Sequence, residues 1–186
     1  MSFMLLGILN SQAAGGGGEE AFDLIQTINT TSTGTVSFGG LGSLTGYKHL
    51  QFRMVMANSA QGTGTMNVYV NGVTSGAPYS DHNIRGFDTG AVYAQGSGNS
   101  NYPEIALIGG ANEGGAQTSV VVDVYDFAST SKNTTFKSRW GVLGSSNTIL
   151  GTSSAAYYNT AAATAIDFKN QSNWTNVKIS MYGIKG

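Results

Sequence analysis

The chain of 186 residues contains no cysteine. This absence excludes disulfide bonds, catalytic thiols and thiolate metal ligands, so stability must come from the core or from contacts between subunits. Histidine is also scarce, with 2 residues in the whole chain. Biological metal sites draw heavily on cysteine and histidine. The sequence therefore predicts no metal centre and no cofactor.

Charged side chains make up only 10% of the chain, whereas about 25% is usual in soluble proteins. The formal net charge is −1, and Arg53, Arg85 and Arg139 are too widely spaced to form a basic stripe. We therefore expect neither nucleic acid nor an anionic membrane as a partner. Glycine, serine, threonine and asparagine fill the polar positions, which predicts a surface of hydroxyl and amide groups.

Long apolar runs are missing as well. No stretch reaches the about 18 apolar residues that a membrane-spanning helix needs, so we expect no insertion into a membrane. The opening segment Met1–Leu9 is apolar, but no lysine or arginine precedes it, as would be typical of a secretory signal peptide.

Four consecutive glycines, Gly15, Gly16, Gly17 and Gly18, follow this opening segment closely. Such a run loses too much backbone entropy to hold a regular element, and it predicts a hinge. We interpret residues 1–18 as an apolar anchor with its hinge, and residues 19–186 as a single domain. Because an apolar peptide is a liability in water, we expect the anchor to dock on a partner protein or a symmetry mate. The alternative is that it forms a first strand of the domain. The docking side chains are Phe3, Met4, Leu5, Leu6, Ile8 and Leu9.

What the sequence does contain is a series of strand patterns. The clearest is Thr118–Phe127, where Val120, Val122 and Val124 share one face, and most of the residues are β-branched or aromatic. A polar turn separates it from Thr134–Val142, which again alternates. The pair predicts a β-hairpin, with Thr118–Phe127 as a central strand.

The remaining strands follow from the same alternation, without any helical period of comparable strength. They are Glu19–Thr30, Thr35–Phe38, Tyr47–Ala57, Thr65–Val70, Tyr79–Ile84, Ile166–Phe168 and Asn176–Ile184. The segment 145–164 is open to two interpretations, a pair of weakly patterned strands or a long surface excursion. The number and spacing of the strands predict an all-β protein, a jelly-roll-like antiparallel β-sandwich.

Two local pairings are also expected. Asn71-Gly72 is the preferred dipeptide of a type I′ turn, so it predicts a hairpin that begins with Thr65–Val70. Further along, we expect Gly90–Tyr93 to pair with Ile105–Ile108 across an exposed loop, Ala94–Pro103, rich in glycine, serine and asparagine.

Loops of this composition often carry binding contacts, and a tyrosine ring can stack on the apolar face of a sugar. We therefore consider this region a candidate glycan-contact loop. The alternative is a plain connector whose tyrosines cap the end of the core. The candidate contact residues are Tyr93, Asn99, Asn101 and Tyr102.

Residues suited to catalysis form no recognisable pattern. His82 beside Asp81 comes closest to a ligand or base pair, but neighbours on a strand point to opposite faces. No G-x-S-x-G motif occurs. Glycoside hydrolysis needs two facing carboxylates, for which the sequence offers only the isolated candidates Asp81, Glu104, Asp123 and Asp126. Calcium binding is typical of a dense acidic run, which the sequence lacks, and its isolated candidates are Asp88, Asp126 and Asn133. We predict that the protein is not an enzyme.

Several segments resemble a family of small virion proteins of tailed phages, abundant among phages of aquatic bacteria. They are M-L-L-G-I-L-N-S-Q-A-A-G-G-G-G at 4–18, F-D-L-I at 22–25, Y-K-H-L-Q-F-R at 47–53, N-V-Y-V-N-G at 67–72, H-N-I-R-G at 82–86, D-V-Y-D-F-A-S-T-S-K-N-T-T at 123–135 and M-Y-G-I-K-G at 181–186. These motifs are strand and turn segments, so the resemblance carries no catalytic residue over to this chain.

The resemblance implies a structural protein on the surface of the phage particle, of tail-fibre type, that docks through its N-terminal peptide and touches host surface glycans. Its partners would be other virion proteins and further copies of itself, and a homotrimer would bury sheet edges. One alternative is a capsid decoration protein that clamps neighbouring capsid subunits. Another, of a different class, is a free carbohydrate-binding or glycan-degrading domain.

Overall fold

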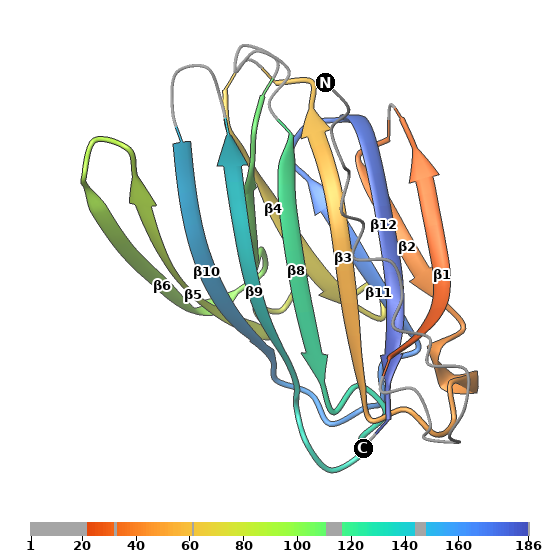
Figure 1. Ribbon diagram of the computed structural model, residues 1–186. Coiled ribbons are helices and arrows are strands. Elements are labelled where there is room, and N and C mark those ends of the chain that lie inside the picture. Colours follow the sequence, from red (N-terminus) through yellow and green to blue (C-terminus); the bar gives the residue numbers. More distant parts are fainter. Residues whose placement is uncertain (1–21, 32, 61, 111–116, 144–147, 186) are drawn as a thin grey trace, which may run out of the picture.

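The computed structural model describes residues 22–31, 33–60, 62–110, 117–143 and 148–185. The predicted anchor and hinge, residues 1–18, lie outside them. The described part is built of strands and one short 3-10 helix (Figure 1). The elements are β1 Phe22–Thr30, β2 Thr35–Gly39, η1 Leu41–Ser43, β3 His49–Asn58, β4 Gly64–Val70, β5 Tyr79–Phe87, β6 Val92–Ser100, β7 Glu104–Ile108, β8 Thr118–Tyr125, β9 Thr134–Leu143, β10 Thr148–Tyr157, β11 Ala165–Asn170 and β12 Trp174–Ile184.

The strands form two antiparallel sheets that pack face to face, as predicted. The larger sheet has eight strands in the order β1-β12-β3-β8-β9-β10-β5-β6, and the smaller has four in the order β2-β11-β4-β7. Strand β8, the clearest of the sequence patterns, lies in the interior of the larger sheet. It pairs with β9 from Thr118 opposite Val142 to Tyr125 opposite Thr135, which confirms the predicted hairpin.

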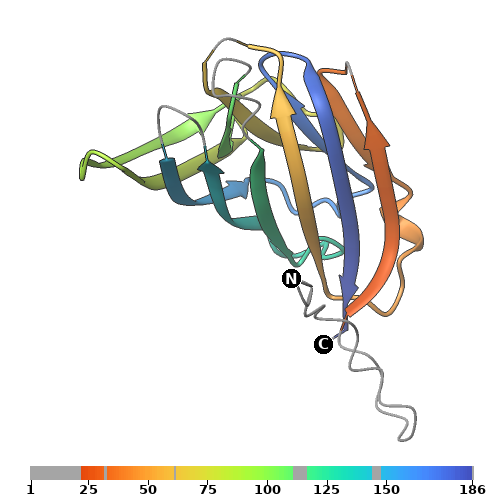
Figure 2. The same ribbon diagram turned by 45° about the horizontal axis from the view of Figure 1, so that its top comes forward.

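Eight of the strands have the nested order of a jelly roll. Numbered from one to eight along the chain, β1, β2, β3, β4, β7, β8, β11 and β12 give the orders 1-8-3-6 and 2-7-4-5 in the two sheets. This nesting defines the jelly roll. The hairpins β5–β6 and β9–β10 are insertions that lie side by side and extend the larger sheet. Figure 2 shows the β5–β6 hairpin projecting past the end of the sandwich.

The core lies between the sheets and is made by the apolar half of each alternating strand. Phe38 of β2 and Phe168 of β11 belong to the smaller sheet, and Phe52 of β3 comes from the larger. Their rings meet edge to face, with centroids 5.1 Å apart for Phe38 and Phe52 and 4.9 Å for Phe52 and Phe168. Such pairs each contribute about 0.5–1.5 kcal/mol beyond the burial of their area. They join the two layers.

The Asn71-Gly72 turn is present, but the hairpin predicted from it is wrong. Asn71 and Gly72 have φ of 54° and 70°, and the Val73 N–H donates to the Val70 carbonyl over 3.0 Å, as a turn of this type requires. However, β4 lies in the smaller sheet and β5 in the larger. The turn therefore carries the chain from one sheet to the other.

The predicted loop Ala94–Pro103 is also wrong over most of its length. Residues Val92–Ser100 form β6 and pair with β5, with Val92 opposite Gly86 and Gln95 opposite Asn83. The expected partner Ile105–Ile108 belongs to β7, which pairs with β4 instead. Main-chain pairing with a well-patterned neighbour overrides the weak strand propensity of glycine and serine here.

The segment 145–164, which the sequence left open, contributes one strand. β10 pairs along its whole length with β9 on one side, and from Ile149 to Tyr157 with β5 on the other. The residues between β10 and β11 form a connection. Within the described residues, no helix has the length and apolarity needed to cross a membrane.

Candidate functional site

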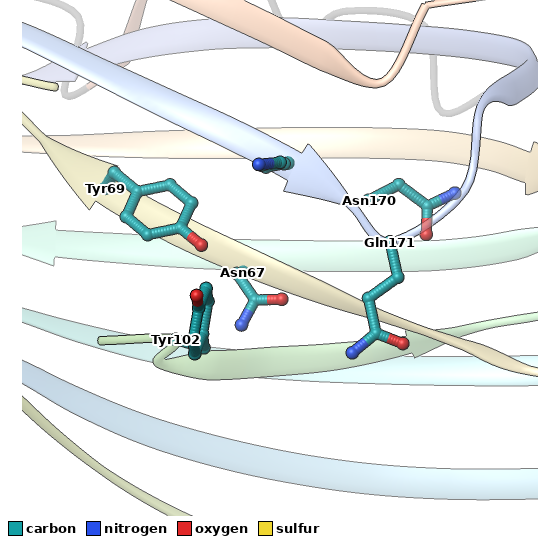
Figure 3. Close-up of a pocket in the computed structure, with 6 residues that line it drawn as sticks. Asn67, Tyr69, Tyr102, Asn170 and Gln171 are labelled. Atoms are coloured by element: carbon teal, nitrogen blue, oxygen red, sulfur yellow. The ribbon is translucent and has the colours of Figure 1, made fainter. Parts of the chain in front are cut away.

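A pocket of about 270 Å³ lies beside the connection between β6 and β7 (Figure 3). Two strands of the smaller sheet and one exposed tyrosine form its walls. The lining residues are Asn67 and Tyr69 of β4, Lys169 and Asn170 of β11, Gln171 just after β11, and Tyr102 of the connection. Most of these side chains carry an amide or a phenol, so the pocket combines ring surface with neutral hydrogen-bonding groups.

The alternation of β4 explains why two of these residues point away from the core. Met66, Val68 and Val70 are fully buried between the sheets, so Asn67 and Tyr69 lie on the opposite face of the strand. Lys169 of the neighbouring strand is directly opposite Asn67 in the register. A cation and an amide are thereby placed side by side on the outer face of the smaller sheet.

The position of Tyr102 is fixed by hydrogen bonds that both of its neighbours accept. The Asn101 Oδ1 accepts from the Ala77 N–H over 2.6 Å, and the Pro103 carbonyl accepts from the Val68 N–H over 3.3 Å. The Tyr102 N–H itself donates to the Ser100 Oγ over 2.9 Å. These bonds fix the backbone, while the side chain stays 66% exposed. Figure 3 shows its ring beside Tyr69 and Asn67.

Three polar side chains of the pocket are available to a ligand. The side chains of Asn67, Lys169 and Gln171 have no hydrogen-bond partner among the residues that the structure describes. Asn170 differs from them, because it shares the inward face of β11 with the core residues Ile166 and Phe168. Its side chain is 2% exposed, and its Nδ2 and Oδ1 are buried without a partner there, so a ligand in the pocket does not reach them.

The electrostatics of the pocket are mild. Burial raises the pKa of Tyr69, and the nearby Tyr102 adds to this rise. Tyr69 therefore keeps its proton at neutral pH and can act as a hydrogen-bond donor. Among the described residues that line the pocket, Lys169 is the single charged side chain, and none is a carboxylate. The ring surface and neutral hydrogen-bonding groups of the pocket suit a polar, hydroxylated ligand.

The carboxylates considered for hydrolysis lie elsewhere. Asp81 of β5 and Glu104 of β7 are 4% and 7% exposed, and Glu104 forms an ion pair with Arg85 at 3.3 Å. Burial raises the pKa of both carboxyl groups, and neither lines the pocket at Tyr102. On the opposite face, Asp123 accepts from the Gln51 Nε2 over 2.7 Å. Asp126 forms an exposed ion pair with Lys132.

The histidines and the calcium candidates do not converge either. Asp81 points inward and His82 outward, as expected for neighbours on a strand. The His49 Nδ1 accepts from the Asp126 N–H over 3.2 Å, which makes it a structural partner of the β8–β9 turn. The described residues contain no group of three or more histidine, aspartate and glutamate side chains that could hold a metal ion.

The four residues of the candidate glycan loop occupy different places. Tyr102 lines the pocket, and Asn101 supports it through Ala77. Tyr93 lies on β6, where the guanidinium carbon of Arg85 is 4.9 Å from the centroid of its ring. Asn99, near the end of that strand, has a positive φ of 63°. Asn67, Lys169 and Gln171 were not foreseen, because alternation shows that a strand residue faces outward but not what lies next to it. The anchor and hinge residues lie outside the described part of the chain.

The fold and the pocket together define a jelly-roll β-sandwich with an amide-lined and tyrosine-lined pocket on its smaller sheet. Comparisons of the chain with protein-family models, with curated proteins and with solved structures found no match.

Proposed function

We propose that the protein is a non-enzymatic structural protein of a tailed-phage particle, displayed on the particle surface, and that the pocket beside Tyr102 binds a saccharide of the host surface. The observation that carries the binding role is the pocket itself. It brings an exposed tyrosine ring together with amide side chains that have no other partner. The jelly roll supports the wider assignment, since viral capsid and lectin domains use this architecture.

A saccharide matches the pocket in size and in chemistry. Ligand pockets for drug-sized molecules measure about 300–1,000 Å³, so a volume of about 270 Å³ suits a single sugar unit, with the rest of a chain outside. The ring of Tyr102 offers a flat apolar surface, while Asn67 and Gln171 offer both donors and acceptors to ring hydroxyls. The Lys169 ammonium adds three donors at the rim.

The binding role is tested by saturation-transfer NMR of the full chain with glucose, galactose, N-acetylglucosamine and galacturonic acid. We expect transfer to at least one of them, and a loss of affinity of tenfold or more in Tyr102→Ala and in Asn67→Ala. Tyr158→Ala serves as the matched control, because Tyr158 is 53% exposed outside the pocket. Absence of transfer to all four sugars, or affinities that Tyr102→Ala leaves unchanged, would overturn the saccharide assignment.

The virion role is tested separately through the N-terminal segment. Deleting residues 1–14 removes the proposed docking side chains and leaves the described domain intact. We expect a folded, soluble product that no longer enters phage particles when it replaces the full chain. Incorporation at the wild-type level would refute docking through this segment. Gold-labelled antibodies on intact particles then separate a tail-fibre position from capsid decoration.

A further inference from the structure

Strand β6 is an open edge of the larger sheet. It is nine residues long, and every residue from Val92 to Asn99 is exposed. One flank pairs with β5, and the other pairs with no strand of the described chain. Its main-chain N–H and C=O groups on that flank are a template for another strand. The hairpin also projects from the sandwich, so a partner can approach it freely (Figure 2).

The other three edges carry devices that discourage pairing. β1 has a bulge between Leu24 and Gln26, and its Asp23 pairs with Lys185 at 3.3 Å. β2 is only five residues long. β7 is buried along its whole length and contacts β5, β9 and β10. β6 has none of these protections over Val92–Gly98, because it contains no charge and no proline, and its irregular pairing lies beyond Gly98.

The sequence of β6 complements itself in one antiparallel register. If Gln95 lies opposite a second Gln95, then Val92 faces Gly98, Tyr93 faces Ser97 and Ala94 faces Gly96. Each larger side chain is matched with a small one, and no like charges meet. Gln95 is held by Arg85, whose Nη2 donates to its Oε1 over 3.1 Å, so its Nε2 remains available to the second copy.

We propose that two copies of the chain pair through β6, antiparallel and around a two-fold axis at Gln95, so that their larger sheets become one continuous sheet. The two-fold pairing uses both open edges and therefore closes, which prevents further growth through β6. The occupant is a second copy because the strand offers neither the charge nor the side-chain pockets that would select a different peptide. This arrangement differs from the homotrimer expected from the sequence.

Sedimentation velocity of the full chain tests the proposal. We expect a species of twice 19.3 kDa. Ala94→Lys and Ala94→Glu should each reduce the mass to one chain, because the two substituted side chains become near neighbours across the axis. An equimolar mixture of the two variants should restore the dimer. Ser119→Lys, an exposed residue of β8 in the same sheet, should leave it unchanged.

A cysteine tests the register directly, since the chain has none of its own. Gln95→Cys places two thiols opposite each other and should form a disulfide-linked dimer on oxidation, whereas Ser97→Cys should not. A monomeric or trimeric wild-type chain, a dimer that survives both charges at 94, or equal cross-linking at 95 and 97 would overturn the two-fold pairing.

Discussion

The indole ring of Trp140 lies over the α-carbon of Gly151, its direct partner across the β9–β10 pair. A Cβ added to Gly151 would come within 2.2 Å of the Trp140 Cζ2, far closer than two carbon atoms can approach. The ring is 4% exposed, and its Nε1 donates to the Ser153 Oγ over 3.4 Å. Gly151 is therefore required by its neighbour, since only a residue without a side chain leaves room for the indole.

We expect Gly151→Ala to lower the free energy of unfolding by about 2 kcal/mol or more, because the indole must leave its position and the packing beneath it must rearrange. Urea unfolding followed by tryptophan fluorescence measures the change. Gly86→Ala in the adjacent strand β5 is the control, since a Cβ there meets nothing within 4 Å. Equal stability of the two variants would contradict the proposed contact.

Tyr79→Phe should lower the free energy of unfolding by about 1–3 kcal/mol, because it removes the partner of the buried Val70 N–H and of the part-buried Val73 carbonyl. The Tyr79 hydroxyl accepts from the Val70 N–H over 3.0 Å and donates to the Val73 carbonyl over 2.9 Å. Burial raises the pKa of Tyr79 to about 12, so the hydroxyl can donate over the working range of pH. Chemical unfolding measures the loss, and Tyr158→Phe, at an exposed hydroxyl, should change stability by less than about 0.5 kcal/mol.

Asn71 should be the most sensitive residue of its turn. Its Oδ1 accepts from the Thr164 and Ala165 N–H groups over 2.7 Å and 3.1 Å, and its Nδ2 donates to the Ala162 carbonyl. We expect Asn71→Ala to cost about 2 kcal/mol, from these bonds and from the positive φ. Asn71→Asp keeps the acceptor and should cost less. A thermal melt that ranks the aspartate variant at or below the alanine variant would contradict this account.

Asp81 should make stability depend on pH. Burial raises the pKa of its carboxyl group, opposed by His82 and by the Glu104 N–H. Because the pKa is raised in the folded state, the contribution of the Asp81 carboxyl group to the free energy of unfolding is fully present below the unfolded pKa of about 3.8. This contribution is lost as pH rises through the folded pKa. Asp81→Asn cannot ionise, so it should match the wild type near pH 3 and be the more stable protein at pH 7. Parallel unfolding curves at the two pH values check this, and a wild type that is the more stable at pH 7 would refute it.

The sequence predicted the strands wherever alternation was strong, and it failed where composition was misleading. Thr118–Phe127 and Tyr47–Ala57 alternate clearly because one of their faces is buried. β6 is exposed on both faces, so nothing in its pattern distinguishes a strand from a loop. The dipeptide Asn71-Gly72 correctly predicted the turn. Which sheet the following strand β5 joins depends on contacts with residues far away in the chain. The pocket shows the same limit, since Tyr102 was identified as an exposed aromatic while Asn67 and Lys169 reach it from distant strands.

The position of β12 between β1 and β3 has a consequence for biosynthesis. The strands β1 and β3 do not pair with each other in the larger sheet, and β12, which pairs with both, is synthesised after the other strands that the structure describes. During synthesis, β3 can pair with β8, whereas β1 has no partner strand in the larger sheet until β12 has been made.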